Sequence, residues 1–124
     1  MMRPPPRGIK LHDRGTQAAL RYLEHRDYEI LDQSWECPDG TIDIVALDDG
    51  VLCFIEVKIN CDKKNGFPSE AVTAQKRARM ESIAASYLME HEYTDIVVRF
   101  DIISLVVLDD KRAFLRFHVN AFGK

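Results

Sequence analysis

Residues 39–60 read DGTIDIVALDDGVLCFIEVKIN and predict two β-strands joined by a tight turn. Asp49-Gly50 favours a two-residue type I′ hairpin, because both central residues of that turn take positive φ. This turn places Asp43 opposite Glu56 on the paired strand. Lys58 lies two positions after Glu56 and shares its face, since side chains alternate along a strand. We therefore expect Asp43, Glu56 and Lys58 to lie on one face.

The length of the turn decides whether this grouping holds. A four-residue loop, with Leu47 opposite Leu52, keeps the same register. A three-residue loop shifts the register by one position and puts Asp43 and Glu56 on opposite faces of the hairpin.

Two directly opposed carboxylates repel each other, because their Cβ atoms come within about 5 Å. A cation between them removes this cost. Mg²⁺ is suitable, since it takes one or two protein carboxylates together with waters and phosphate oxygens. A neighbouring lysine can orient an attacking water or stabilise charge on a phosphate. The alternative is a solvated, charged end of a hairpin in which Lys58 only neutralises Glu56.

Length and composition predict one globular domain. A chain of 124 residues with 46% hydrophobic and 30% charged residues can bury a core. The net charge of −3 gives no overall field that attracts nucleic acid, so such binding needs a local basic patch. Residues 1–12 are rich in proline and are expected to form a disordered tail, with the domain spanning residues 13–124.

Cysteine usage and hydropathy indicate a cytoplasmic protein. Cys37, Cys53 and Cys61 form no C-x-x-C pair, and a buried, reduced thiol is expected for Cys53 in its apolar strand. The longest apolar run, residues 102–108, is too short to span a membrane. The N-terminal residues lack the apolar core of a signal peptide. No membrane partner is therefore expected.

The order of the predicted elements is typical of an α/β fold. Around the central hairpin, apolar periodicity predicts helices at 16–26 and 68–90 and strands at 28–37, 94–108 and 113–122. The inward stripes are Ala19, Leu20 and Leu23 in the first helix, and Val72, Ile83, Ala84, Tyr87 and Leu88 in the second. A break is expected near Thr73. The expected architecture is a single domain with a mixed central sheet flanked by helices.

One basic cluster lies on the second predicted helix, in the segment QKRAR. Helical spacing puts Gln75, Lys76 and Arg79 on one face and turns Arg77 away from them. Such a face could bind nucleic-acid phosphates through point charges and forked donors. The alternative is an ordinary solvated helix surface.

The remaining polar residues predict one structural ion pair and give no support for several common catalytic or nucleotide-binding sites. Arg99 and Asp101 alternate onto one face of their strand, which predicts a structural ion pair. The four histidines share no metal-ligand spacing, and the chain contains no Walker loop, G-x-G-x-x-G motif or Ser/His/Asp set.

An ordered set of short motifs resembles the YraN-like family of small bacterial proteins. The segments that carry the resemblance are GTIDIVALDDGVLCFIEVK, FPSEAV, QKRARM, VRFDII and a final NAF. The resemblance runs from about Gly15 to Phe122. That family in turn resembles the PD-(D/E)xK nuclease superfamily and, within it, the archaeal Holliday-junction resolvases.

The resemblance implies a restriction-endonuclease-like fold and phosphodiester hydrolysis that depends on Mg²⁺ or Mn²⁺. Asp43 would be the motif aspartate, and Glu56-Val57-Lys58 the E-x-K element. Asp43 and Glu56 would hold the metal, and Lys58 would assist the attacking water. Lys76 matches a family lysine with a phosphate-binding or auxiliary role. The implied partner is structured or branched DNA, and a homodimer is implied because junctions have paired arms.

The chain departs from the family pattern around this site. Relatives carry an acid where this chain has Thr16, and another where it has Thr41. The predicted register places Thr41 opposite Lys58, so an acid is missing beside the lysine. A common family arginine is Asn60 here. Asp13 and Asp39 are open alternatives as substitute acids.

Three functions follow from these patterns. The first is an endonuclease-like enzyme, weak or degenerate because of Thr16 and Thr41. The alternative is a non-catalytic protein that keeps the nuclease fold and binds nucleic acid or a DNA-processing partner. A protein–protein adaptor is a third, supported only by the acidic net charge.

Overall fold

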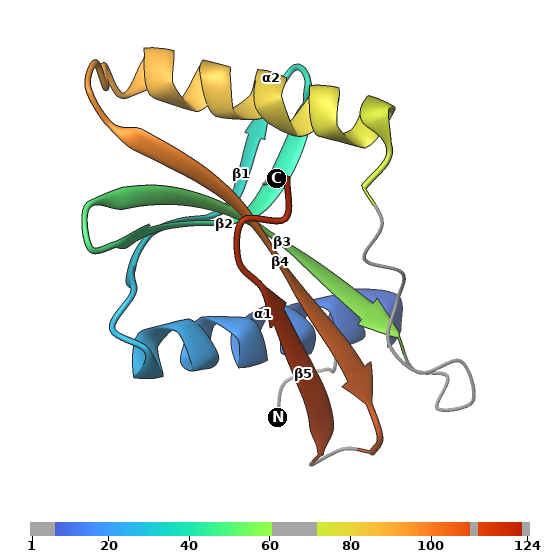
Figure 1. The fold of residues 1–124 in the computed structure, drawn as a ribbon. Helices are drawn as coiled ribbons and strands as arrows, with labels where there is room; N and C mark the ends of the chain where they lie inside the picture. The colour runs from blue at the N-terminus through green and yellow to red at the C-terminus, as the bar shows by residue number, and fades with distance from the viewer. Residues whose placement is uncertain (1–6, 61–71, 110–111, 123–124) are drawn as a thin grey trace, which may run out of the picture.

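Two helices enclose a five-stranded mixed sheet, one on each face (Figure 1). This computed structural model describes residues 7–60, 72–109 and 112–122. The elements in chain order are α1 (Arg7–His25), β1 (Glu29–Cys37), β2 (Gly40–Asp48), β3 (Val51–Asn60), α2 (Ala74–Glu90), β4 (Val97–Val107) and β5 (Ala113–His118). The chain is a single α/β domain, as predicted, and its architecture is consistent with a restriction-endonuclease-like fold.

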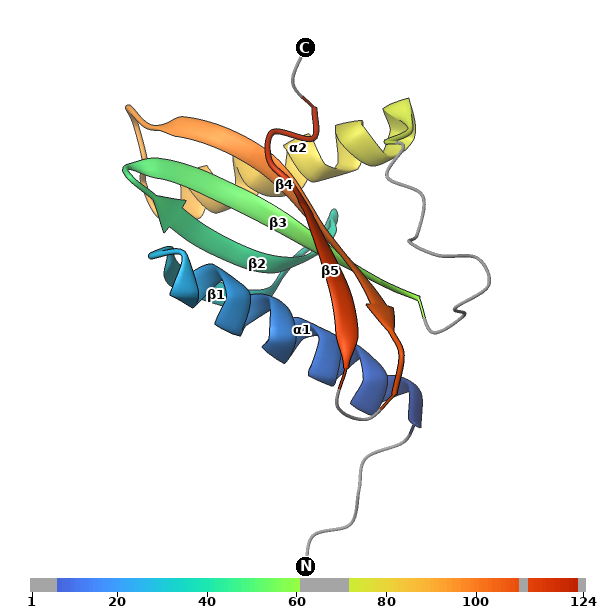
Figure 2. The same ribbon diagram turned by 60° about the horizontal axis from the view of Figure 1, so that its bottom comes forward.

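The strands lie in the order β1-β2-β3-β4-β5. Neighbouring strands are antiparallel except for β3 and β4, which are parallel and joined by the crossover that contains α2. A parallel pair needs such a crossover, because a hairpin can join only antiparallel strands. Figure 2 shows α1 lying along the face of the sheet opposite α2.

Each helix buries its apolar stripe against its own face of the sheet. On the α1 side, the predicted residues Ala19, Leu20 and Leu23 pack in a cluster with Ile44, Cys53, Ile55, Ile103 and Leu105. On the α2 side, Met80, Ile83, Ala84 and Tyr87 pack with Ile42, Val45, Leu52 and Phe54. These two layers exclude water from both sides of β3, whose residues from Leu52 to Ile55 are fully buried.

Cys53 is a free, buried thiol on the α1 side, as predicted. Burial raises the pKa of the Cys53 thiol to about 12, since the low-dielectric core disfavours the thiolate. Cys61 lies outside the described residues.

The helices begin at positions that differ from the predictions. Helix α1 begins at Arg7, inside the stretch predicted to be a tail; residues 1–6 lie outside the described part. Helix α2 begins at Ala74, and Thr73 caps it by accepting a hydrogen bond from the Lys76 amide at 3.1 Å. Val72 therefore precedes the helix and is not part of its inward stripe, a correction to the prediction.

A membrane-spanning helix needs about 20 predominantly apolar residues in a row. Within the described residues, no helix has both the length and the apolar character needed to cross a bilayer.

Candidate functional site

The β2–β3 hairpin has the predicted two-residue turn. Asp49 and Gly50 both take positive φ, 50° and 83°, and the strand pairs run from Asp48↔Val51 to Ile44↔Ile55. This register excludes the three-residue loop, which would have reversed the faces of the acidic residues.

The two strands separate immediately after this ladder. The last paired residue of β2 on this side is Ile44, and the preceding residue, Asp43, reaches β3 through its side chain. Asp43 Oδ2 accepts a hydrogen bond of 2.7 Å from the backbone N–H of Val57. The Asp43 carboxylate therefore accepts a backbone hydrogen bond from β3 at the point where β2 separates from that strand.

Because β2 separates from β3, the predicted pairing of Thr41 with Lys58 is wrong. Thr41 pairs with Glu36 on β1, not with Lys58 on β3, because β2 has already diverged. The threonine is exposed and belongs to the β1–β2 hairpin. Position 41 is therefore not a cross-strand partner of the lysine in this fold.

The diverging hairpin bends toward α2. Ile42 packs in the α2-side cluster and Ile44 in the α1-side cluster, although residues two apart share a face in a regular strand. Ser34, across from Asp43 on β1, has a positive φ of 49°. In Figure 1 the tip of this hairpin rises behind α2, and a Cβ on Gly40 would lie 3.3 Å from Ile83 Cδ1 of that helix.

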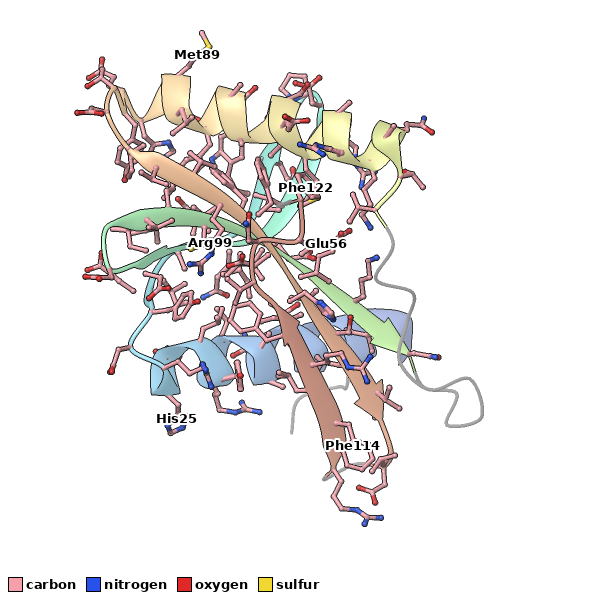
Figure 3. The ribbon with its side chains drawn as sticks, viewed as in Figure 1. His25, Glu56, Met89, Arg99, Phe114 and Phe122 are labelled. Carbon is pink, nitrogen blue, oxygen red and sulfur yellow. The ribbon has the colours of Figure 1, made fainter. Side chains whose placement is uncertain are left out.

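Glu56 faces the same helix from β3. Lys76 Nζ, in the first turn of α2, lies 2.7 Å from Glu56 Oε2, and the two side chains are 22% and 20% exposed respectively. The oxygen itself is buried, and among the described residues no group donates a well-aligned hydrogen bond to it. The contact with Lys76 is therefore a close ion pair, and this ammonium is the positive charge that the structure places against the buried oxygen. Glu56 is labelled in Figure 3.

Lys58 shares the Glu56 face by strand alternation and begins a row across three strands. Its partner on β4 is Ser104, whose own partner on β5 is Arg116. Ser104 is fully buried, and its Oγ has no hydrogen-bond partner among the described residues. Sequence analysis missed Ser104 and Arg116, because their place in this row depends on a parallel pairing that no local pattern reveals.

The predicted nucleic-acid-binding residues lie together. Gln75, Lys76 and Arg79 line, with Thr73, a hollow of about 500 Å³ at the beginning of α2. Arg77 points elsewhere, as predicted, with its Nε 3.6 Å from Glu81 Oε1. The structure thus joins the basic face of α2 to the Glu56 site through a single residue, Lys76.

The acidic residues offer a limited set of metal ligands. Within the described residues, no three His, Cys, Asp or Glu side chains gather into a metal-binding group. Asp13 lines a separate hollow with Arg112, and Asp39 lies in the β1–β2 turn, so neither completes such a group with the two carboxylates. Asp43 and Glu56 are the kind of ligand that Mg²⁺ uses when water and phosphate supply the rest of its coordination. The buried Glu56 Oε2 is a carboxylate oxygen that such a cation could take only in competition with Lys76.

Arg99 and Asp101 lie on the other face of the sheet, beside Cys53 and Ile55. Arg99 Nε lies 2.9 Å from Asp101 Oδ1, which confirms the predicted ion pair. Burial lowers the pKa of Arg99, but the hydrogen bond and charge of Asp101 raise it more, so the net shift is upward. The pair is remote from the Glu56 face and is structural.

Comparison with known proteins identifies a matching family and several similar proteins. Residues 15–105 match the family described as Uncharacterised protein family UPF0102. A UPF0102 protein of Beutenbergia cavernae is 40% identical over 92 residues, which cover 74% of this chain and 78% of the relative. One of Roseiflexus castenholzii is 37% identical over 102 residues, 82% of each chain. One of Lachnoclostridium phytofermentans is 37% identical over 109 residues, covering 87% of this chain and 90% of the relative.

Proposed function

The chain belongs to the uncharacterised protein family UPF0102, and we propose that it is a metal-dependent endonuclease-like protein that acts on structured DNA. One observation carries the proposal. At the point where β2 leaves β3, the Asp43 carboxylate reaches the residue after Glu56, and Glu56 itself contacts Lys76. Acids and lysines beside a basic hollow are the groups that phosphodiester hydrolysis requires.

Each residue has a role in this proposal. Asp43 and Glu56 would hold Mg²⁺ or Mn²⁺, which when bound polarises a phosphate oxygen and activates a water. Lys58, on the Glu56 face, would orient the attacking water or stabilise charge that develops on the phosphate. Gln75, Lys76 and Arg79 line one hollow and would donate to backbone phosphate oxygens.

The expected activity is weak, because the acidic shell is reduced. The family resemblance implies an acid at the position of Thr16 on the first helix, and Thr16 is only 5% exposed. Thr41 lies on the exposed β1–β2 hairpin. Two carboxylates leave most of the metal coordination to water and substrate, so metal and DNA are expected to bind cooperatively.

Cleavage of a four-way junction, compared with a linear duplex of the same sequence, tests the proposal. Wild-type protein should cut slowly with Mg²⁺ or Mn²⁺ and not with EDTA, and Glu56→Gln should abolish cutting without loss of folding. Glu90→Gln is the matched control, because Glu90 is an exposed acid at the far end of α2. Equal cleavage by wild type and Glu56→Gln would place the activity outside this site.

The second candidate is a non-catalytic protein that binds nucleic acid or a DNA-processing partner. It is favoured by the same Lys76–Glu56 contact, because a lysine at 2.7 Å already balances one of only two carboxylates. This function predicts salt-sensitive DNA binding that Glu56→Gln leaves unchanged, weaker binding in Arg79→Ala, and no turnover with any metal.

A further inference from the structure

The position of Lys76 is electrostatically unusual for its helix. It lies in the first turn of α2, where the helix dipole favours anions, and this turn contains no acidic residue. The negative charge instead comes from β3, through Glu56 at 2.7 Å. Lys76 is therefore held at this helix end by a carboxylate of the proposed metal site.

We propose that Lys76 is a built-in counter-ion that exchanges with the divalent cation at Glu56. This inference rests on the proposed metal site and adds how that site is regulated. Without metal, Lys76 balances the partly buried carboxylate. A cation that takes Glu56 Oε2 displaces the ammonium, because two positive charges against one partly buried carboxylate repel each other strongly.

The displaced ammonium has one favourable destination. Both the bound cation and the helix dipole repel Lys76, so its flexible side chain turns outward into the hollow that it lines with Thr73, Gln75 and Arg79. A DNA phosphate in that hollow would then pair with the Lys76 ammonium, which no longer contacts Glu56. Metal and phosphate should consequently strengthen each other's binding, and the coupling between them is reciprocal.

Calorimetric titration of Mn²⁺ into three proteins tests the exchange without using cleavage. Lys76→Met keeps the aliphatic length but removes the competing charge, and it should bind Mn²⁺ about five-fold more tightly than wild type, as expected for loss of an ion pair of ordinary strength. Arg79→Met is the matched control, since it removes a positive charge from the same hollow. Its affinity should stay within about two-fold of wild type.

Three results would overturn the exchange: unchanged or weaker binding by Lys76→Met, an equal gain in Arg79→Met, or no Mn²⁺ binding by any of the three proteins. Tight binding by Lys76→Met without any DNA cleavage would refute the nuclease but keep the exchange. DNA cleavage by wild type, together with equal Mn²⁺ affinities of the three proteins, would keep the nuclease and refute the exchange.

Amine labelling of the wild-type protein gives an independent readout. A limiting acetylating reagent, with peptide mass spectrometry, reports how accessible Lys76 is. Saturating Mg²⁺ should raise acetylation of Lys76, and Glu56→Gln should show the raised level without metal. Labelling of Lys76 that is the same with and without Mg²⁺ would contradict displacement from Glu56.

Discussion

At the scale of single residues, Asp43 has a structural contact as well as a proposed chemical role. Its Oδ2 accepts the Val57 N–H at 2.7 Å, a donor that the β2 backbone no longer reaches. The carboxylate thereby fixes its own position beside Glu56. A substitution at this residue consequently changes both stability and charge, and the two effects need separate variants.

Asp43→Ala and Asp43→Asn separate these effects. Alanine leaves the partly buried Val57 N–H without its acceptor and should lower the free energy of unfolding by about 1–3 kcal/mol. Asparagine retains an acceptor oxygen and should cost less than about 1 kcal/mol while removing the charge. Urea unfolding at neutral pH measures both. Equal losses in the two variants would show that the charge, not the hydrogen bond, stabilises this junction.

Sequence reasoning named the residues of the candidate site but not the contacts between them. Alternation and turn chemistry were sufficient to predict the Asp48↔Val51 register, because both are local rules. The Lys76–Glu56 contact depends on how α2 packs after a crossover. Spacing within the chain predicted that Lys76 shares a helix face with Gln75 and Arg79, but it does not encode the contact of that lysine with Glu56.

At the scale of elements, the departure of β2 from β3 is the feature that a regular pattern could not reveal. A continuous ladder predicted that Thr41 would face Lys58, whereas a side chain-to-backbone bond at Asp43 and a positive φ at Ser34 end the ladder and redirect the hairpin. Both are single-residue irregularities inside otherwise ideal strand sequence. The helices and strands are those that periodicity predicted, but their bounds differ. Helix α1 extends further toward the N-terminus than its apolar stripe indicated. Strand β4 begins at Val97 and β5 ends at His118, so the predicted strands at 94–108 and 113–122 were too long.

The packing of α1 on β3 depends on one glycine. A Cβ on Gly15 would overlap Ile59 Cδ1 and lie 2.8 Å from Ile59 Cγ1, so the helix backbone approaches β3 closely here. Alanine normally stabilises a helix interior relative to glycine by about 1 kcal/mol. At position 15 the overlap with Ile59 should make alanine destabilising relative to glycine.

Gly15→Ala should therefore lower the free energy of unfolding, by about 1–3 kcal/mol for overpacking. Ile59→Val removes the overlapping Cδ1 and should recover part of the loss. Chemical denaturation of the two single variants and the double variant gives the coupling energy between the sites. Additive effects would mean that the helix does not contact Ile59 in the way described.

At the scale of the whole molecule, a buried polar network connects the sheet to its C-terminal segment. Arg99 donates to Tyr28 Oη at 2.7 Å and contacts Asp48 Oδ2 at 3.2 Å as well as Asp101. Asp101 also accepts the backbone N–H of Asn120 at 2.7 Å. These contacts join the chain before β1 to β2, β4 and the turn after β5.

Removal of one partner should show how much the network matters. Asp101 is fully buried, so Asp101→Ala leaves the largely buried Arg99 without its main counter-ion and should cost about 3–5 kcal/mol. Asp109→Ala is the control, since Asp109 pairs with Arg112 at the surface and should cost about 1 kcal/mol or less. Thermal and urea unfolding of both variants provide the comparison. Similar small losses would mean that solvent already screens the Arg99 pair.

The proposed function depends on metal binding at Asp43 and Glu56, and calorimetry tests that proposal most directly. Mg²⁺ and Mn²⁺ are titrated into wild type, Asp43→Asn and Glu56→Gln, after circular dichroism has shown that all three are folded. Wild type should give a saturable binding heat that both variants lose, because each removes one of the two carboxylates. Identical titration curves for wild type and the two variants would contradict a metal site at Asp43 and Glu56.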